Sequence, residues 1–162
     1  MIRKADPATD AEAICNIYKD YVDKTTITFE TVAPGVEEMR KRICEVGERF
    51  PYLVYVDEGK VAGYCYAHPW KERAAYYPTW ETTVYLNPAA KGKGAGKKLM
   101  LKLIDECRER GARSLIACIT AENETSCNFH ERLGFQRVSL FKEVGEKFGR
   151  FLDVADYQFM LF

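Results

Sequence analysis

This sequence of 162 residues has few histidines and tryptophans and no net charge. The chain has two histidines and two tryptophans, and its 24 Lys and Arg residues equal its 24 Asp and Glu residues in number. Such a charge balance gives no overall electrostatic support for binding nucleic acid or another polyanion. Because histidines are few and no ligand side chains cluster, we expect no structural metal.

Long apolar runs and closely spaced cysteine pairs are also missing. No stretch reaches the roughly 18 apolar residues of a membrane span, and no apolar run follows Met1–Asp6, so we expect neither a span nor a signal peptide. The six cysteines are scattered without a C-x-x-C pair, and several sit among apolar neighbours. This usage predicts reduced, buried thiols in a cytoplasmic protein. The length favours one domain over residues 1–162.

The most informative stretch is a glycine loop, Lys91–Lys97. Its three glycines alternate with other residues, so backbone N–H groups can approach a ligand where no Cβ intervenes. A predicted strand, Thr79–Leu86, precedes the loop, and a predicted helix, Ala95–Arg110, follows it. A strand, a glycine loop and a helix N-terminus in this order form a layout that binds phosphate.

Two familiar nucleotide motifs do not fit the spacing of this loop. A Walker loop requires a glycine five residues before Gly96, where Lys91 stands, and a Ser or Thr after Lys97, where Lys98 stands. A Rossmann fingerprint requires a longer step between its last two glycines than the one from Gly94 to Gly96. A mobile, basic turn without a ligand is the alternative.

The rest of the chain predicts a mixed α/β order, β-α-α-β-β-β-α-β-α-β-β. The other predicted helices are Ala11–Asp23 with Asp10 as its cap, Val36–Glu48, and a short helix from Asn123 to Leu133. The other predicted strands are Met1–Lys4, Tyr52–Val56, Val61–Ala67, Ser114–Ile119, Phe135–Glu143 and Leu152–Leu161, the last two joined through Gly145–Gly149. Thr25–Phe29 is expected to be extended, and His68–Pro78 to be an irregular loop.

Together, the glycine loop and the segment Asn123–Phe135 resemble the GCN5-related N-acetyltransferase (GNAT) superfamily. In that family the pattern [QR]-x-x-G-x-[GA] binds the pyrophosphate of coenzyme A, and Lys91-x-x-Gly94-x-Gly96 matches it with Lys in the first position. The resemblance implies acetyl-CoA as co-substrate, without a metal. It also implies a mostly antiparallel central sheet of about six to seven strands flanked by about four helices.

A closer resemblance, to the phosphinothricin and methionine sulfoximine N-acetyltransferases, covers nearly the whole chain. The matching segments lie in 14–18, 28–30, 69–76, 81–85 and 144–154. Three departures are Lys19 for the group's usual Asn, Trp80 for a small aliphatic residue, and Phe151 for Trp. Trp80 neighbours a candidate catalytic residue, so we expect it to affect the shape of the acceptor pocket. The resemblance also implies a homodimer with the acceptor pocket near the subunit interface.

Transfer of an acetyl group to an amine needs a bound donor, a deprotonated amine, a stabilised oxyanion and a proton for the leaving thiolate. Glu81, which faces opposite to Val84 and Leu86 by strand alternation, is the candidate general base. His130 lies seven residues after Asn123, where many GNAT enzymes have a tyrosine, and is the candidate acid. The structural alternatives are an exposed glutamate that balances a basic side chain, and a packed histidine.

The donor and the acceptor have separate candidate residues. By resemblance the pantetheine arm lies beside Val84–Leu86, and Asn123 is a helix cap, a pantetheine partner, or both. The predicted cofactor-binding residues are Val84, Tyr85, Leu86, Gly92, Lys93, Gly94, Ala95, Gly96, Lys97, Asn123 and Ser126. Basic and aromatic loop residues suit an anionic acceptor, or else form a solvated loop. The predicted substrate-binding residues are Lys71, Arg73, Tyr76 and Lys147.

These observations predict an acetyl-CoA-dependent N-acetyltransferase that acts on the α-amino group of a small amino acid analogue such as phosphinothricin or methionine sulfoximine. Direct transfer is preferred to an acyl-enzyme, because nothing in the sequence pairs Cys118 or Cys127 with a base. The alternatives are a GNAT enzyme for another amine (a polyamine, another amino acid or a protein N-terminus) and a non-catalytic module that binds acyl-CoA.

Overall fold

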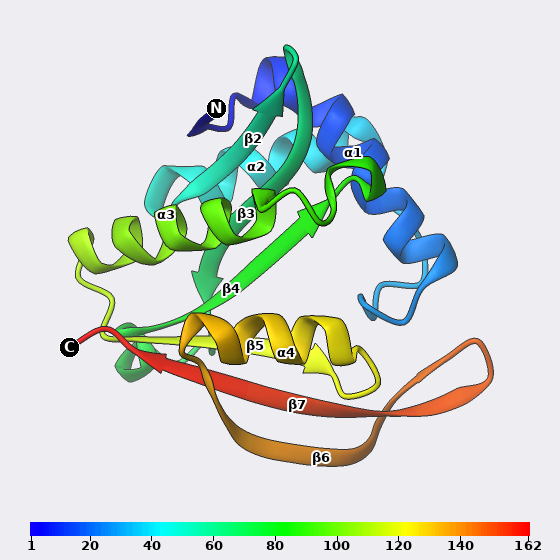
Figure 1. Ribbon diagram of the computed structural model, residues 1–162, viewed down its shortest axis with the longest axis vertical. Helices are drawn as coiled ribbons and strands as arrows, with labels where there is room; N and C mark the ends of the chain where they lie inside the picture. Colours follow the sequence, from blue (N-terminus) through cyan, green and yellow to red (C-terminus); the bar gives the residue numbers. More distant parts are fainter.

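The computed structural model describes residues 1–162 as a mixed seven-stranded sheet with two helices on each face (Figure 1). The strand order is β1-β2-β3-β4-β5-β7-β6. The strands are β1 Ile2–Lys4, β2 Tyr52–Asp57, β3 Lys60–Pro69, β4 Thr79–Leu86, β5 Ser114–Thr120, β6 Gln136–Lys147 and β7 Arg150–Met160. The helices are α1 Pro7–Lys24, α2 Val36–Arg49, α3 Ala95–Glu109 and α4 Glu124–Leu133. The predicted fold class and element order are therefore confirmed.

The sheet divides where β4 meets β5. All the other neighbouring strands pair antiparallel, whereas β4 and β5 pair parallel over Thr79–Glu81 and Ser114–Ile116 alone. Beyond that point β4 stays paired with β3 as far as Leu86, and β5 stays paired with β7 as far as Thr120. The two strands diverge in Figure 1, and the gap between them lies at the middle of the sheet.

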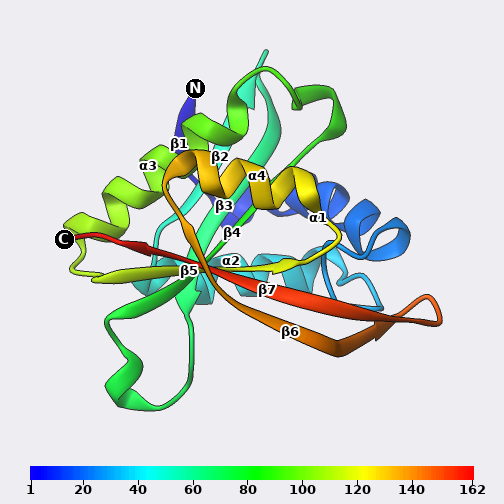
Figure 2. The same cartoon turned by 60° about the horizontal axis from the view of Figure 1, so that its bottom comes forward.

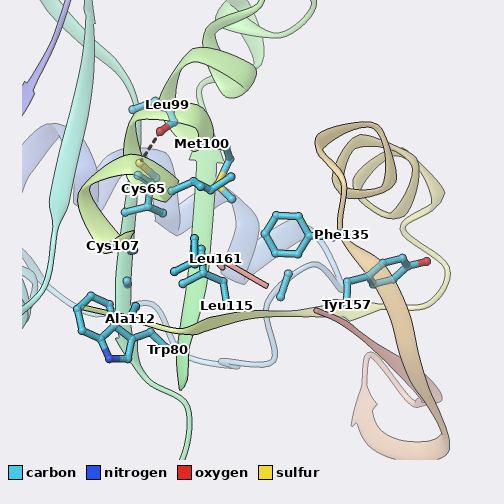
Figure 3. Close-up of a cluster of buried hydrophobic side chains, with 14 of the residues drawn as sticks. Cys65, Trp80, Leu99, Met100, Cys107, Ala112, Leu115, Phe135, Tyr157 and Leu161 are labelled. Atoms are coloured by element: carbon cyan, nitrogen blue, oxygen red, sulfur yellow. Dashed lines mark hydrogen bonds between the residues drawn. The ribbon is translucent and has the colours of Figure 1, made fainter. Parts of the chain in front are cut away.

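Two buried clusters fix the helices on the sheet. On one face, α3 packs Leu99, Met100 and Leu103 against Trp80 and Leu115 (Figure 3). On the other face, the apolar stripe of α1 packs with α2 and with tyrosines of β2 and β3. In α3 and in α1 the apolar residues recur at helical spacing and so form the buried face of the helix, as the sequence predicts. No helix combines the length and the apolar character that a membrane crossing needs.

Helix α1 begins earlier than its sequence suggests. Asp6, not Asp10, is the cap, because its side chain accepts a hydrogen bond from the N–H of Ala8 (2.9 Å) and Pro7 occupies the first helical position. Asp10 is buried and binds the two terminal nitrogens of Arg3 at 2.6 and 2.8 Å. The ion pair lowers the pKa of Asp10. The predicted cap is therefore wrong.

The segment Thr25–Phe29 belongs to no strand, although its β-branched residues suggest an extended conformation. Side chains from distant parts of the chain hold it. Thr26 donates to Glu122 at 2.5 Å, and its carbonyl accepts from Thr120 at 2.6 Å. Two side-chain nitrogens of Arg150 bind the same Glu122, each at 3.0 Å. Long-range contacts thus decide a conformation that local propensity leaves open.

The last two strands are longer than predicted. Gly145–Lys147, expected in the connection, pair with Arg150–Leu152, so the turn is the pair Phe148-Gly149 alone. Both turn residues have positive φ (52° and 70°), as a two-residue hairpin of type I′ requires. Strand β3 also extends further than predicted. It runs through His68 and Pro69, so the irregular loop begins at Trp70.

All six cysteines are free thiols in the structure. The prediction of burial is wrong for Cys44 and Cys118, which are exposed. Cys118 is the one exposed residue of β5, which is otherwise buried along its length.

Candidate active site

A groove of about 780 Å³ runs between the glycine loop, the end of β4 and α4, and we call it the loop groove. Every predicted cofactor-binding residue except Lys93 lines it. The other residues of its lining are Tyr21, Ile27, Lys91, Thr125, Phe129, Arg132 and Leu133.

The backbone of the glycine loop suits an anion at the start of α3. Gly92 and Gly94 have φ of 76° and 79°, a region that residues with a Cβ rarely adopt. Gly94 is the cap of α3 and has no side chain that could occupy the first N–H groups, whereas Asp6 and Asn123 cap α1 and α4. The space where a Cβ of Gly94 would stand is open. These N–H groups and the helix dipole therefore fit a diphosphate.

Several residues that line the loop groove escape the sequence analysis. Thr125, Phe129 and Arg132 recur at helical spacing on α4, so the periodicity that follows Asn123 could have identified this face. Tyr21 has no comparable signal, because it comes from α1 and donates its hydroxyl to the carbonyl of Leu86 at 2.5 Å.

A second cavity of about 270 Å³ lies where β4 and β5 diverge, and we call it the gap pocket. It shares Ile27, Val84, Tyr85, Asn123 and Ser126 with the loop groove, so the two spaces are adjacent. Glu81 from β4 and His130 from α4 both line it. The structure thus brings both predicted catalytic residues to one pocket.

Glu81 lies on the face of the sheet opposite to Trp80, as strand alternation predicts. Its half-buried position raises the pKa of its carboxyl, and His68 acts in the opposite direction. His68 is the register partner of Glu81 on β3, and its Nε2 lies 3.8 Å from Oε1 of Glu81. The charged neighbours of Glu81 are thus His68 and Asp156, not the basic loop residues.

Replacing His68 by Gln is expected to move the acid limb of the pH–rate profile to higher pH. A protonated His68 favours the ionised form of Glu81, and the base must be ionised to work, so its loss raises the pKa through which activity appears. The profile of kcat/KM for the amine gives this limb. An acid limb at the wild-type position would show that His68 does not influence the base.

His130 is buried, and its hydrogen bond fixes the tautomer of the ring. Nδ1 lies 2.8 Å from the carbonyl oxygen of Ser126, so Nδ1 carries the proton and Nε2 keeps a lone pair. Phe129 and Phe135 pack edge-on against the ring. This burial lowers the pKa of His130, so the ring is neutral at pH 7. Nε2 can therefore donate a proton only after it has received one.

Cys118 also lines the gap pocket, beside Glu81 of β4 and Asp156, its partner on β7. Although Cys118 is the exposed residue of β5, the walls of the pocket keep bulk water from its thiol, and this desolvation together with the two carboxylates raises the pKa of the thiol well above its ordinary range. A thiol in this environment is a poor nucleophile, because the reactive form is the thiolate. The environment thus agrees with direct transfer rather than a Cys118 acyl-enzyme.

The predicted substrate-binding residues line neither space. Lys71, Arg73 and Tyr76 lie on the exposed loop that extends from the body of the molecule (Figure 2), where the amine of Lys71 sits 4.5 Å from the ring centre of Trp70. Lys147 is buried and donates to the carbonyl of Thr28 at 2.8 Å. Their part in acceptor binding stays a prediction.

Trp80 does not face the gap pocket. It packs edge-on against Phe50 in the core beneath α3, and its indole donates to the carbonyl of Tyr77 at 2.8 Å. Trp80 therefore does not line the gap pocket, and its effect on the shape of the acceptor pocket stays a prediction.

Comparison with known proteins agrees with this geometry. Residues 2–155 match the family described as the acetyltransferase (GNAT) domain. A phosphinothricin N-acetyltransferase of Alcaligenes faecalis is 41% identical over 148 residues, which are 90% of this chain and 75% of the relative. An L-methionine sulfoximine/L-methionine sulfone acetyltransferase of Salmonella typhimurium is 36% identical over 164 residues, covering 99% of this chain and 94% of the relative.

Two solved structures are similar over the whole fold. An acetyltransferase of Salmonella typhimurium, solved with its cofactor acetyl-CoA, superposes with a TM-score of 0.97 at 34% identity, over 100% of this chain and 94% of the other. A phosphinothricin acetyltransferase of Sinorhizobium meliloti, in complex with acetyl-CoA, gives a TM-score of 0.95 at 38% identity, over 99% and 87% of the two chains. The match to the family model and the identity to whole-length relatives establish that this chain belongs to the GNAT acetyltransferase family.

Proposed function

We propose that residues 1–162 form a single domain that transfers the acetyl group of acetyl-CoA to the α-amino group of a small amino acid analogue such as phosphinothricin, methionine sulfoximine or methionine sulfone. The observation that carries the proposal is the meeting of Glu81 and His130 in one pocket, which lies next to a groove lined by the glycine loop. The named relatives support this class of acceptor. The six free thiols support a cytoplasmic location.

The loop groove holds the donor. Acetyl-CoA, when bound, supplies an acetyl group activated as a thioester. The N–H groups of Gly92–Lys97 and the dipole of α3 bind the diphosphate, and Lys93 and Lys97 add screened positive charge. The free edge of β4 at Val84–Leu86 lies along the groove, and its N–H groups stabilise negative charge that develops on the thioester oxygen.

Glu81 prepares the acceptor. The amine arrives as an ammonium group, which has no lone pair for attack, and the ionised carboxylate of Glu81 takes its proton through water. The raised pKa of Glu81 makes this carboxylate a stronger base than an exposed glutamate.

His130 returns a proton at the end of the transfer. Its Nε2 lone pair accepts the second proton, which the amine nitrogen loses once it has attacked the thioester, and then passes that proton to the leaving thiolate, while Nδ1 stays bonded to Ser126. This sequence reconciles the predicted role as an acid with the observed tautomer.

Replacing His130 by Phe is expected to lower kcat by about 10²-fold, at the low end for a general acid–base residue, with a smaller effect on the KM for acetyl-CoA. Phenylalanine fills the same aromatic cluster but can neither accept nor donate a proton. Steady-state rates of thiol release give both constants. Unaltered kinetics in a folded variant would remove His130 from the mechanism.

The acceptor side of the proposal includes a homodimer. Lys71, Arg73 and Tyr76 are remote from the chain's own gap pocket, and Lys147 supports its wall through Thr28. The outer strand β6 exposes four apolar side chains, Val138, Leu140, Phe141 and Val144. A free edge of this kind favours a partner. Light scattering after size exclusion decides the point, since a mass near the 18.6 kDa of one chain would contradict a dimer.

A panel of acceptors, read by release of coenzyme A thiol, tests the proposed activity. Phosphinothricin, methionine sulfoximine and methionine sulfone are expected to be acetylated, and spermidine and a peptide with a free N-terminus serve as competitors. Activity confined to spermidine or the peptide would assign another amine. Tight acetyl-CoA binding without turnover of any acceptor would assign a non-catalytic acyl-CoA-binding module.

A further inference from the structure

One aromatic side chain in the wall of the gap pocket packs directly against a glycine. Phe29, from the connection between α1 and α2, lines the pocket, and its ring lies against the backbone of Gly145 in β6. A Cβ on Gly145 would come within 2.2 Å of Cε2, 2.7 Å of Cζ and 2.9 Å of Cδ2 of that ring. These distances are too short for non-bonded carbons, whose optimum is about 3.5–4.0 Å. Gly145 does not line the pocket itself, so it acts there only through Phe29.

The backbone of Gly145 does not by itself require glycine. Its φ lies outside the left-handed region, unlike that of Gly149 (70°) in the same hairpin, and it pairs with Leu152 in the ladder between β6 and β7. Alanine would therefore fit the local conformation without strain. The three atoms nearest to a Cβ at this position all belong to the Phe29 ring.

The segment that carries Phe29 is not free to retreat from β6. The carbonyl of Thr28 accepts from the buried amine of Lys147, two residues beyond Gly145 (2.8 Å). The hydroxyl of Thr28 bonds to that of Tyr18 on α1 at 2.8 Å. Because the backbone is held from two sides, and because Phe29 is 41% exposed, rotation of its ring is the direct way to accommodate a side chain at position 145.

We propose that Gly145 is a specificity-determining position that sets the depth of the acceptor pocket by letting the Phe29 ring lie back against β6. A larger residue turns the ring into the gap pocket, where it takes the space of the acceptor's side chain. Acceptors with a long side chain and a tetrahedral head, such as phosphinothricin, lose affinity, and short amino acids are spared. Gly145 is a positioning residue, and its role rests on the proposed acetylation of amino acid analogues.

Gly145→Ala tests the proposal through the split between substrates. The KM for phosphinothricin is expected to rise roughly 10- to 100-fold, as for the loss of a methylene-sized space in an apolar pocket, while the KM for acetyl-CoA stays at its wild-type value. Addition of Phe29→Ala should restore the KM for phosphinothricin, because the ring with which the new Cβ clashes is then absent. Gly47→Ala is the matched control, since a Cβ at Gly47 meets nothing within 4 Å and φ is ordinary there.

Three outcomes would overturn the proposal. The first is an equal loss for phosphinothricin and acetyl-CoA, and the second is a failure of Phe29→Ala to restore the alanine variant. The third is a crystal structure of Gly145→Ala with the ring turned to solvent. Should Gly145→Ala not fold, Phe29→Ala alone must widen the range of accepted side chains, and an unchanged range would be decisive against the idea. A wild-type protein inactive on every amino acid would instead refute the proposed function, while the ring position in the crystal would still test Gly145.

Discussion

Replacement of Glu81 by Gln is expected to lower kcat by about 10²–10⁴-fold, the usual contribution of a general base. Glutamine has the same shape but cannot accept the ammonium proton, and Glu81 is the one carboxylate among the residues that line the gap pocket. Affinity for acetyl-CoA should be unchanged, because the loop groove does not include Glu81. Steady-state rates and calorimetric titration with acetyl-CoA measure the two effects separately.

The pH dependence supplies a second readout of the same variant. Burial raises the pKa of Glu81, so the wild-type rate rises with pH through a value above that of an ordinary glutamate, and Glu81→Gln should lose this limb. Glu106→Gln is a suitable control, because Glu106 is also largely shielded but lies on α3 in ion pairs with Lys102 and Arg110. Retention of kcat in Glu81→Gln would exclude Glu81 as the base.

Replacement of Gly94 by Val is expected to raise the KM for acetyl-CoA by about tenfold or more. At φ of 79° a β-branched residue costs on the order of 1–3 kcal/mol, so the variant relieves the strain by leaving the loop conformation and must take it up again on binding, where each 1.4 kcal/mol corresponds to tenfold. The new side chain also occupies the open space through which the diphosphate approaches the N–H groups of α3. Steady-state kinetics with varied acetyl-CoA gives the constant.

Gly111→Val controls for strain at the opposite end of the same helix. Gly111 has φ of 90° and, like Gly94, nothing near the position of a Cβ, but it is remote from the loop groove. We expect it to lower the free energy of unfolding without changing the KM for acetyl-CoA. Equal constants for the two valine variants would contradict a diphosphate site at Gly94.

The parts of the site that depend on neighbouring residues could be predicted from the sequence. Strand β4, the glycine loop and the start of α3 are contiguous, and their turn residues and periodicity appear within a short window. Asn123 caps α4 and Gly134 ends it with φ of 101°, both as the local pattern indicates. Strand alternation also predicts that Trp80 faces away from Glu81, as it does in the structure.

The remaining features depend on contacts between distant residues. Nothing near Phe29 in the sequence indicates that its ring packs on Gly145. Nothing near Glu81 indicates that His68, on the neighbouring strand, is its partner. The tautomer of His130 follows from a carbonyl one helical turn away, which needs the ring orientation as well as the helix. Sequence patterns thus identified residues for the site, whereas their protonation and packing required the fold.

The short parallel ladder between β4 and β5 has a consequence for folding stability. Across that boundary the backbone contributes pairing over Thr79–Glu81 alone, and beyond it the gap pocket lies between the diverging strands, next to the loop groove. A ligand bound as proposed would contact β4 on one side and α4, which follows β5, on the other, and it would have no equivalent site in the unfolded chain. At 100 times its dissociation constant it stabilises the native state by about 2.7 kcal/mol. The melting temperature of this enzyme is therefore expected to rise with the concentration of acetyl-CoA.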